Sequence, residues 1–457
     1  MRLKAYYSIV FFALLLFVSC EKDPVTPDPD PPPPPTGYKQ YGTPFDQMPA
    51  TDDAVMYEVN LRAFSQAGNL QGVRSRLDEM KALGVNVIWL MPIYPDGEVN
   101  SVNSPYCIKN FKGISTEYGS LADLRLLTTE AHARGMAIIL DWVANHTSWD
   151  NAWISHKDWY SQDAGGNIIH PAGTNWQDVA DLDFNNAEMR LAMIDAMKYW
   201  VLEANVDGYR CDYADGVPFD FWQQAIDTLN NVPNRKLIFL AEGGRADHFQ
   251  AGFDLNFSWD FYTKVKEVFN GQPARELFTT HSEEYTSVPD GKHKLRFTTN
   301  HDQSAWENTP MVLFQGMQGA LAASVATIFM GGVPLFYTGQ EVGRMATLPF
   351  FTKSPINWNE NPGMLLAYKA MMTFYSATPA ARTGIVTDYS NDDVICFTKS
   401  LGDTQVLIMI NSKNASVAFP VPTVIRELPW NNAITNDTLQ FGPSFQLGSY
   451  TYLMATR

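Results

Sequence analysis

The sequence predicts an α/β protein, a closed (β/α)8 TIM barrel with a small subdomain inserted after the third strand and an antiparallel β domain at its C-terminus. Three observations lead to this prediction. Short β-rich apolar runs alternate with segments of helical periodicity from residue 53 onward, which is typical of βαβ units. The long Trp- and Gly-rich segment 148–186 interrupts this alternation. Beyond residue 380, strand-like runs follow one another with turn residues between them, and no helix is predicted.

The strands of the barrel are expected where the apolar runs lie, at residues 55–59, 85–90, 137–143, 206–212, 236–241, 253–257, 295–299 and 333–337. Helical patterns lie between the earlier strands, at residues 73–83, 121–134, 187–204 and 219–229. Segment 148–186 is too long for an ordinary loop, so we expect it to be the inserted subdomain. The barrel domain then spans residues 37–378. The C-terminal β domain spans 379–457, with strand-like runs at 394–398, 405–410 and 415–421.

The N-terminus predicts export and lipid attachment. After two basic residues, the apolar run 6–18 has the length of a signal-peptide core and is too short to span a bilayer. The run ends at Ser19-Cys20, which resembles a bacterial lipobox, so we expect residues 1–19 to be removed and Cys20 to be lipidated. An ordinary signal peptide with an incidental cysteine is the alternative. Residues 20–36 are so rich in proline that they predict an extended tether.

These features predict an exported bacterial lipoprotein of the cell envelope, at the outer membrane. The sequence does not decide which face of the membrane the protein occupies. The net charge of −16 becomes −18 when Arg2 and Lys4 leave with the signal peptide. Such a charge disfavours nucleic acid and anionic membrane surfaces, so membrane contact is expected through the lipid alone. A neutral polysaccharide is indifferent to it.

The remaining cysteines, Cys107, Cys211 and Cys396, are scattered and lack metal-ligand spacing. We expect buried free thiols rather than disulfides or a zinc site. Hydrophobic residues make up 45% of the chain and charged residues 18%, which predicts a well-buried globular core.

Polar and acidic side chains gather where four expected strands end. Active sites of such barrels lie at this end of the strands. A single acidic residue there could be a helix cap, but several together with Arg and His indicate a catalytic pocket. The residues are Asp141, Asn145 and His146 in IILDWVANH, Arg210 and Asp212 in DGYRCD, Glu242 in FLAE, and His301 and Asp302 in FTTNHD.

Two of these carboxyl groups suit the cleavage of a glycosidic bond, which needs an acid on the leaving oxygen and a carboxylate at the sugar carbon. Arg210 lies two residues before Asp212, and therefore on the same side of the strand. Its fixed charge would keep Asp212 ionised and able to attack. Glu242 would hold its proton near neutrality if burial and a neighbouring carboxylate raised its pKa.

In order and spacing, these segments resemble the signatures of the alpha-amylase family of glycoside hydrolases (family 13). DWVANH, GYRCD, AEGG and TNHD are similar to its four signatures, and the resemblance covers roughly residues 53–345. It implies that Asp212 is the nucleophile, Glu242 the acid/base and Asp302 a stabiliser of the transition state. It also implies retention of the anomeric configuration, with the two principal carboxyl groups about 5–5.5 Å apart.

The resemblance further implies a set of side chains that bind the sugar in the cleaved subsite. Tyr106 would stack beneath that sugar, while His146, Arg210 and His301 would hydrogen-bond to it. Asn145 matches a calcium-ligand position, but members without the metal also have Asn there. We therefore expect no cofactor, with calcium as the alternative.

The sequence after the expected nucleophile departs from the family pattern. Many alpha-amylases carry a Lys-His pair there, whereas this chain reads Tyr213-Ala214-Asp215-Gly216. The expected function is still a retaining glycoside hydrolase that cleaves α-1,4 bonds in starch or maltodextrins. The alternatives are an α-glucosidase, a neopullulanase-like enzyme or a transglycosylating enzyme of the same family, or a non-catalytic glycan-binding surface lipoprotein. The presence of all three principal carboxylates argues against the last alternative.

Three tryptophans lie near the motifs and could serve either as sugar platforms or as core packing. They are Trp142, Trp176 and Trp306.

Overall fold

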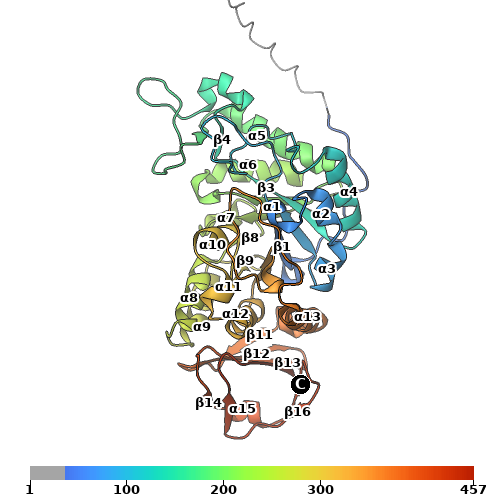
Figure 1. The fold of residues 1–457 in the computed structure, drawn as a ribbon, viewed down its shortest axis with the longest axis vertical. Helices are drawn as coiled ribbons and strands as arrows, with labels where there is room; N and C mark the ends of the chain where they lie inside the picture. Colours follow the sequence, from blue (N-terminus) through green and yellow to red (C-terminus); the bar gives the residue numbers. More distant parts are fainter. Residues whose placement is uncertain (1–36) are drawn as a thin grey trace, which may run out of the picture. The chain divides into compact units, whose positions relative to one another are not determined.

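The computed structural model describes residues 37–457, so the expected signal peptide, Cys20 and the expected tether lie outside the described residues. Residues Lys39–Arg457 form one compact unit. Within it, parallel strands close into a barrel in the order β1-β10-β9-β8-β7-β6-β3-β2 (Figure 1). These strands are β1 (Met56–Val59), β2 (Val87–Leu90), β3 (Ala137–Trp142), β6 (Gly208–Cys211), β7 (Ile238–Ala241), β8 (Leu255–Phe257), β9 (His293–Arg296) and β10 (Val333–Tyr337).

Side chains along the barrel strands alternate between two buried layers. Met56, Ile139 and Leu240 belong to the core inside the barrel, whereas their neighbours in sequence face the core between barrel and helices. Because the period of a strand is two residues, the next inward positions after these three are Glu58, Asp141 and Glu242. The apolar interior therefore ends in a ring of carboxyl groups.

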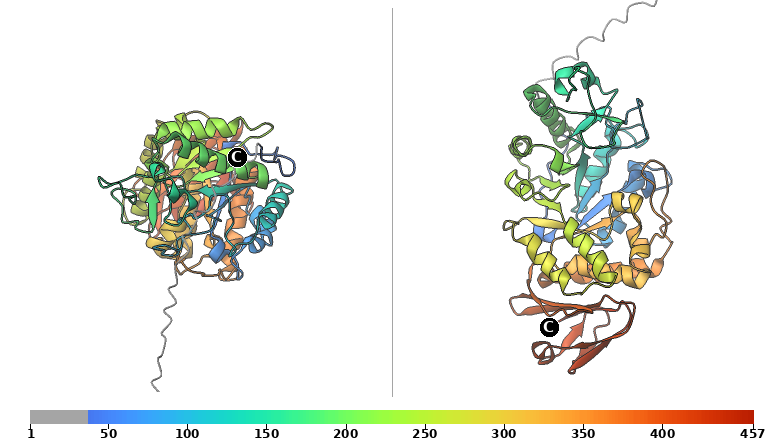
Figure 2. Two further views of the ribbon diagram at one scale, coloured as in Figure 1. Left: turned by 90° about the horizontal axis from the view of Figure 1, so that it is seen from above. Right: turned by 90° about the vertical axis from the view of Figure 1, so that its left-hand side faces the viewer.

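Helices follow the strands and cover the outside of the barrel (Figures 1 and 2). Most are amphipathic and bury one face, as in α6, where Phe221, Ala225 and Ile226 are buried. The helices up to β10 are α1 (Leu61–Phe64), α2 (Leu70–Arg74), α3 (Leu77–Ala82), α4 (Leu121–His132), α5 (Ala187–Tyr199), α6 (Phe219–Asn230), α7 (Asp247–Gln250), α8 (Trp259–Phe269), α9 (Glu276–Tyr285), α10 (His301–Trp306), α11 (Pro310–Leu313) and α12 (Met317–Phe329). α13 (Pro362–Ala377), α14 (Pro379–Thr383) and α15 (Thr423–Arg426) follow.

Three helix or strand predictions were wrong in detail. The helix expected at 73–83 is two helices, α2 and α3, because the Ser75 hydroxyl donates to the Gly72 carbonyl and interrupts the pattern. The expected strand 295–299 is shifted to His293–Arg296, since the chain beyond it leaves the sheet and Asn300 caps α10 by accepting from the Gln303 N–H. Two short helices, α14 and α15, lie beyond residue 378, where none was expected.

The segment expected as the inserted subdomain begins and ends on a two-stranded antiparallel sheet. β4 (His146–Ser148) pairs with β5 (Val179–Asp181). Between them lie two short 3₁₀ turns, Ala152–Ser155 and Lys157–Trp159. This sheet starts only four residues after β3, so it brings His146 next to the strand ends of the barrel.

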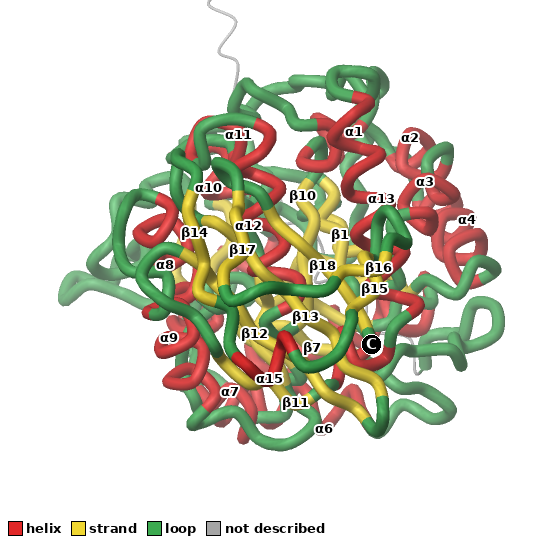
Figure 3. Tube along the Cα trace, turned by 90° about the horizontal axis from the view of Figure 1, so that it is seen from below, coloured by secondary structure: helices red, strands yellow, loops and turns green. Residues whose placement is uncertain are grey.

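The C-terminal part of the chain is an antiparallel sheet in the order β11-β12-β13-β18-β15-β16 (Figure 3). One face of it, including Ile395 and Ile408, shares the core of the barrel helices. The other face, including Cys396 and Met409, packs on a separate core with the short sheet of β14 and β17. The strands are β11 (Ile385–Asp388), β12 (Val394–Leu401), β13 (Thr404–Asn411), β14 (Val417–Pro420), β15 (Trp430–Asn432), β16 (Thr438–Leu439), β17 (Ser444–Leu447) and β18 (Tyr452–Thr456).

The expectation for the three later cysteines is confirmed, since Cys107, Cys211 and Cys396 are buried free thiols. In residues 37–457, no helix combines the length and the apolar character that crossing a bilayer requires.

Candidate active site

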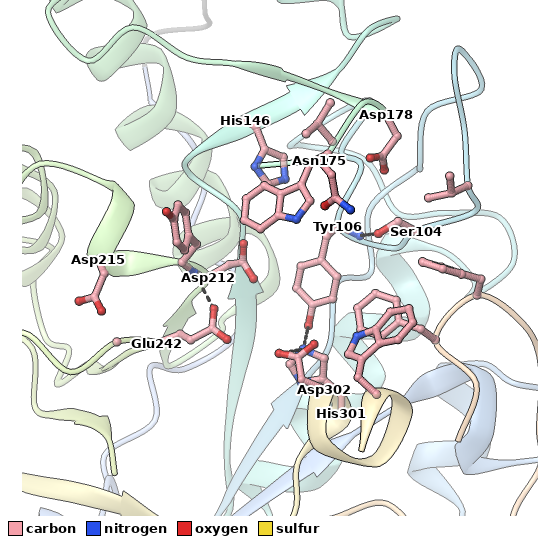
Figure 4. A pocket seen from close by; sticks show the side chains of 18 of the residues that line it. Ser104, Tyr106, His146, Asn175, Asp178, Asp212, Asp215, Glu242, His301 and Asp302 are labelled. Atoms are coloured by element: carbon pink, nitrogen blue, oxygen red, sulfur yellow. Dashed lines mark hydrogen bonds and ion pairs between the residues drawn. The ribbon is translucent and has the colours of Figure 1, made fainter. Parts of the chain in front are cut away.

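A cavity of about 760 Å³ opens at the carboxyl ends of the barrel strands (Figure 4). Six of the seven side chains expected in a catalytic site line it: Tyr106, His146, Asp212, Glu242, His301 and Asp302. In Figure 4, Glu242 and Asp212 lie on one side of the cavity, and Tyr106, His301 and Asp302 lie on the other. The sequence therefore predicted residues that the fold brings together from five separate segments.

Arg210, the seventh residue, lies fully buried beneath the cavity and joins three carboxylates. Its Nη1 atom lies 2.8 Å from Asp141 Oδ1 and 2.9 Å from Asp212 Oδ1. Its Nη2 atom lies 2.7 Å from Glu242 Oε1. One rigid guanidinium therefore lies between Asp212 and Glu242. It donates a hydrogen bond to Asp212 from Nη1, and its contact with Glu242 is an ion pair without hydrogen-bond geometry.

The close approach of β6 and β7 supports this arrangement. A Cβ atom at Gly208 would lie 1.9 Å from the Ile238 carbonyl oxygen, so only glycine allows the two strands to pair here. Arg210 lies two residues after Gly208, and Asp212 lies two residues after Arg210, so both side chains are on the same side of the chain along β6. Glu242 directly follows the neighbouring strand β7.

The two carboxyl groups differ in pKa. Burial raises the pKa of Asp212 to about 6, although Arg210 opposes the shift. Burial, together with the charges of Asp212 and Asp302, raises the pKa of Glu242 to about 7, again against Arg210. Glu242 thus keeps its proton at a higher pH than Asp212, which is the order that an acid and a nucleophile require.

The residue after Asp212 has a strained backbone. Tyr213 has a φ of 41°, a left-handed conformation that non-glycine residues rarely adopt. In this conformation its backbone N–H donates to Glu242 Oε2 over 2.7 Å. Such strain is concentrated at functional sites, where the surrounding structure maintains it.

His301 sits in a chain of buried polar groups. Its Nδ1 atom contacts Glu58, and its Nε2 atom lies 2.9 Å from the Tyr106 hydroxyl, which donates to Asp141 Oδ2 over 3.1 Å. Burial alone would lower the pKa of His301, but Asp302 and Glu58 raise it to about 9. At neutral pH the ring is therefore cationic and donates from both nitrogens.

His146 has the opposite character. Burial lowers its pKa to about 4, so it is neutral at physiological pH. A neutral imidazole can form hydrogen bonds with sugar hydroxyls without adding charge to the cavity.

The position where the resemblance places a calcium ligand, Asn145, is also buried. Its amide nitrogen lies 3.4 Å from His146 Nδ1. Within residues 37–457, no three His, Cys, Asp or Glu side chains gather where they could hold a metal ion.

Sequence reasoning missed Glu58 and some of the aromatic side chains that line the cavity, Phe350 and Phe351 among them. Glu58 is an inward residue of β1, and its period-two spacing from Met56 was the signal that could have identified it. Of the three tryptophans, Trp176 and Trp306 line the cavity. Trp142 is core packing, since it is fully buried against Tyr94 and Tyr209.

The chain is similar to known proteins over most of its length. The family model described as the alpha-amylase catalytic domain matches residues 47–393. Alpha-amylase MalA of Haloarcula japonica is 24% identical over 83% of the chain, which spans 58% of that relative's length. Probable oligo-1,6-glucosidase 2 of Bacillus subtilis is 33% identical over 65% of the chain and 66% of its own length. Among solved structures, an alpha-amylase from Lactobacillus plantarum is similar with a TM-score of 0.80 and 27% identity, covering 89% of this chain and 99% of that chain.

Proposed function

Because the chain belongs to the alpha-amylase family of glycoside hydrolases, we propose that it cleaves α-1,4-glucosidic bonds of starch and maltodextrins with retention of configuration. One observation carries the proposal. A single guanidinium, that of Arg210, contacts the carboxyl groups of Asp212 and Glu242, and the pKa of Glu242 is the higher of the two. Retaining cleavage needs such a pair, one member ionised and one protonated.

In the first step, an Asp212 carboxylate oxygen bonds to the anomeric carbon of the sugar while the bond from that carbon to the leaving oxygen breaks. Glu242 gives its proton to the leaving oxygen, and the released chain departs with a new hydroxyl. The result is a glycosyl ester on Asp212. Arg210 favours this step because its charge stabilises Asp212 as a carboxylate before the attack.

In the second step, Glu242, now a carboxylate, takes a proton from water while the water oxygen bonds to the anomeric carbon. The bond between that carbon and Asp212 breaks, and both carboxyl groups return to their starting states. Two displacements at one carbon restore the original anomer. The proposed steps use no metal.

The remaining side chains of the cavity would bind the sugar in the cleaved position. Tyr106 would lie beneath the sugar ring, while His146 would form hydrogen bonds with its hydroxyls. The cationic His301 would donate to a hydroxyl by exchanging its bond with the Tyr106 hydroxyl, since its other N–H is held by Glu58. We propose that Asp302 accepts hydrogen bonds from hydroxyls of the same sugar, which would strengthen as positive charge develops at the anomeric carbon.

A second candidate function within the family is an α-glucosidase or an oligo-1,6-glucosidase. The absence of the Lys-His pair that many alpha-amylases carry after the nucleophile favours it, and Asp215 from this segment lines the cavity beyond Glu242, on the side away from Tyr106. The relative from Bacillus subtilis named probable oligo-1,6-glucosidase 2 supports the same alternative.

Product analysis on starch, maltoheptaose and pullulan tests the proposal. We expect α-configured maltooligosaccharides of several lengths from starch, followed over time by chromatography and by the anomeric signals in NMR spectra. Early glucose or panose as the dominant product would instead favour the α-glucosidase or a neopullulanase-like enzyme. Asp212→Asn is the matched control, since it keeps the shape of the side chain. No product from the folded wild-type protein would contradict the proposal and favour a non-catalytic glycan-binding protein.

A further inference from the structure

Three aromatic side chains, Trp306, Phe350 and Phe351, form what we call the aromatic shelf at one end of the cavity. Trp306 is 66% exposed. Its ring centroid lies 5.7 Å from that of Phe350 and 6.0 Å from that of Phe351. A large aromatic side chain left this exposed beside an active site indicates a surface that a ligand covers.

The shelf is continuous with Tyr106. The rings of Phe350 and Tyr106 are stacked, with centroids 5.6 Å apart and planes at 27°. Apolar ring surface therefore runs from the position of the cleaved sugar outward to Trp306. Val102, which also lines the cavity, directly precedes Asn103, whose side chain donates to the Phe351 carbonyl.

Hydrogen bonds between distant segments hold the shelf in place. The Leu348 N–H donates to Ser304 Oγ over 3.2 Å, which ties the loop after β10 to α10. The Thr309 hydroxyl donates to the Met345 carbonyl over 3.2 Å. The side-chain amide of Asn103 donates to the Phe351 carbonyl, which joins the loop after β2 to the same wall. A surface fixed in this way loses little conformational entropy when a ligand binds.

The position of Glu242 indicates which part of a bound glucan lies at the aromatic shelf. Glu242 would protonate the leaving oxygen, so the released part of the glucan lies on its side of the cavity, toward Asp215 (Figure 4). The glucosyl units that remain joined to the cleaved sugar extend the other way, past Tyr106. This is the end of the cavity that the shelf occupies.

We propose that the aromatic shelf binds, by stacking on their apolar pyranose faces, the glucosyl units on the non-reducing side of the cleaved one. The inference rests on the proposed function and deepens it, because the shelf would make the enzyme prefer glucan chains over glucosides with a single sugar. Flat C–H-rich sugar faces and aromatic rings pack well because both are apolar there, while the hydroxyls at the sugar edge stay in water.

The test compares two aryl glycosides that differ only in how far they reach. 4-Nitrophenyl α-glucoside places one sugar over Tyr106, whereas 4-nitrophenyl α-maltotrioside, cleaved at the aryl bond, also reaches the shelf. We expect Trp306→Ala to lower kcat/KM for the trioside by about tenfold, the size of a lost aromatic stacking contact, mainly through KM. The loss for the glucoside should be much smaller, and Trp306→Phe should recover most of the trioside activity.

Leu366→Ala is the matched control, since Leu366 is 67% exposed on α13 and lies outside the cavity lining. An equal loss on both substrates would overturn the proposal, because Trp306 would then act by positioning α10 and Asp302. An unchanged trioside activity in Trp306→Ala would also overturn it. A wild-type enzyme inactive on starch as well as on both aryl glycosides would contradict the proposed function itself, and with it the ligand of the shelf.

Discussion

The backbone N–H of Tyr213 donates to Oε2 of Glu242 over 2.7 Å. Because Tyr213 directly follows Asp212, the turn that positions one carboxyl group also orients the other. This contact requires the strained left-handed conformation of Tyr213. The hydrogen bond from the Ala214 N–H to the Glu242 carbonyl oxygen helps to maintain that conformation. The separation of the two carboxyl groups is thus built into the backbone as well as into Arg210.

The pKa order predicts a bell-shaped dependence of kcat/KM on pH. Activity should fall as the pH drops through about 6, where Asp212 takes up a proton. It should also fall as the pH rises through about 7, where Glu242 loses its proton. In Glu242→Gln, assayed on an aryl glycoside whose leaving group needs no acid, the alkaline limb should vanish. An alkaline limb that persists there would assign it to another group.

The raised pKa of His301 depends on its carboxylate neighbours, so Glu58→Gln should lower it. Removing one of the two negative charges beside the ring should bring its pKa of about 9 closer to the ordinary value of about 6.5. NMR titration of the His301 ring protons measures this shift. Glu341→Gln is the matched control, since it changes a buried carboxyl that bonds to Tyr57 instead. If both variants leave the pKa unchanged, Glu58 does not stabilise the imidazolium.

Glu341 predicts a pH-dependent stability. Burial raises its pKa to about 7 from an ordinary 4.5, and Oε2 has no hydrogen-bond partner among the described residues. A raised pKa means that stability is fully present below about pH 4.5 and is lost as the pH rises through about 7. Glu341→Gln, which resembles the protonated form, should therefore raise Tm relative to wild type at pH 8 but not at pH 5. An equal shift at both values would contradict the assignment.

We propose that Cys20 carries the lipid that attaches the protein to the cell envelope. In the native host, Cys20→Ala should move the protein from the membrane fraction to the soluble exported fraction, because the thiol that accepts the lipid is gone. Ser19→Ala is the control, since it keeps a small residue before the cysteine and should stay membrane-bound. Membrane attachment that survives Cys20→Ala would show that the lipobox interpretation is wrong.

Much of the site could be predicted because strand periodicity and strand ends are local properties of the sequence. Asp212 and Glu242 each end an apolar run, and the closed barrel brings all such ends to one rim. Glu58 also lies near the end of a strand, but nothing in its own segment indicates that His301, 243 residues away in sequence, would be its partner. Such pairings depend on strand order, which local patterns do not contain.

Loops and helix boundaries were harder to predict for the same reason. The wall that carries Phe350 and Phe351 is held by contacts to Ser304 and Asn103, from two other segments of the chain. The shift of β9 follows from the cap that Asn300 places on α10, a side-chain bond that competes with the sheet. The sequence does not show whether Trp142 and Trp306 are buried or exposed. Only the packing around them shows that Trp142 belongs to the core and that Trp306 lines the cavity.

Trapping of the covalent intermediate tests the central claim most directly. An α-maltosyl fluoride with a second fluorine at C5 of its reacting sugar should form the glycosyl ester quickly and release it slowly, because fluorine disfavours the cationic transition state and fluoride leaves readily. Mass spectrometry of the digested protein should then show one maltosyl adduct, on Asp212, and none in Asp212→Asn. An adduct on Glu242 or Asp302 instead, or an inverted product formed without any adduct, would contradict the account.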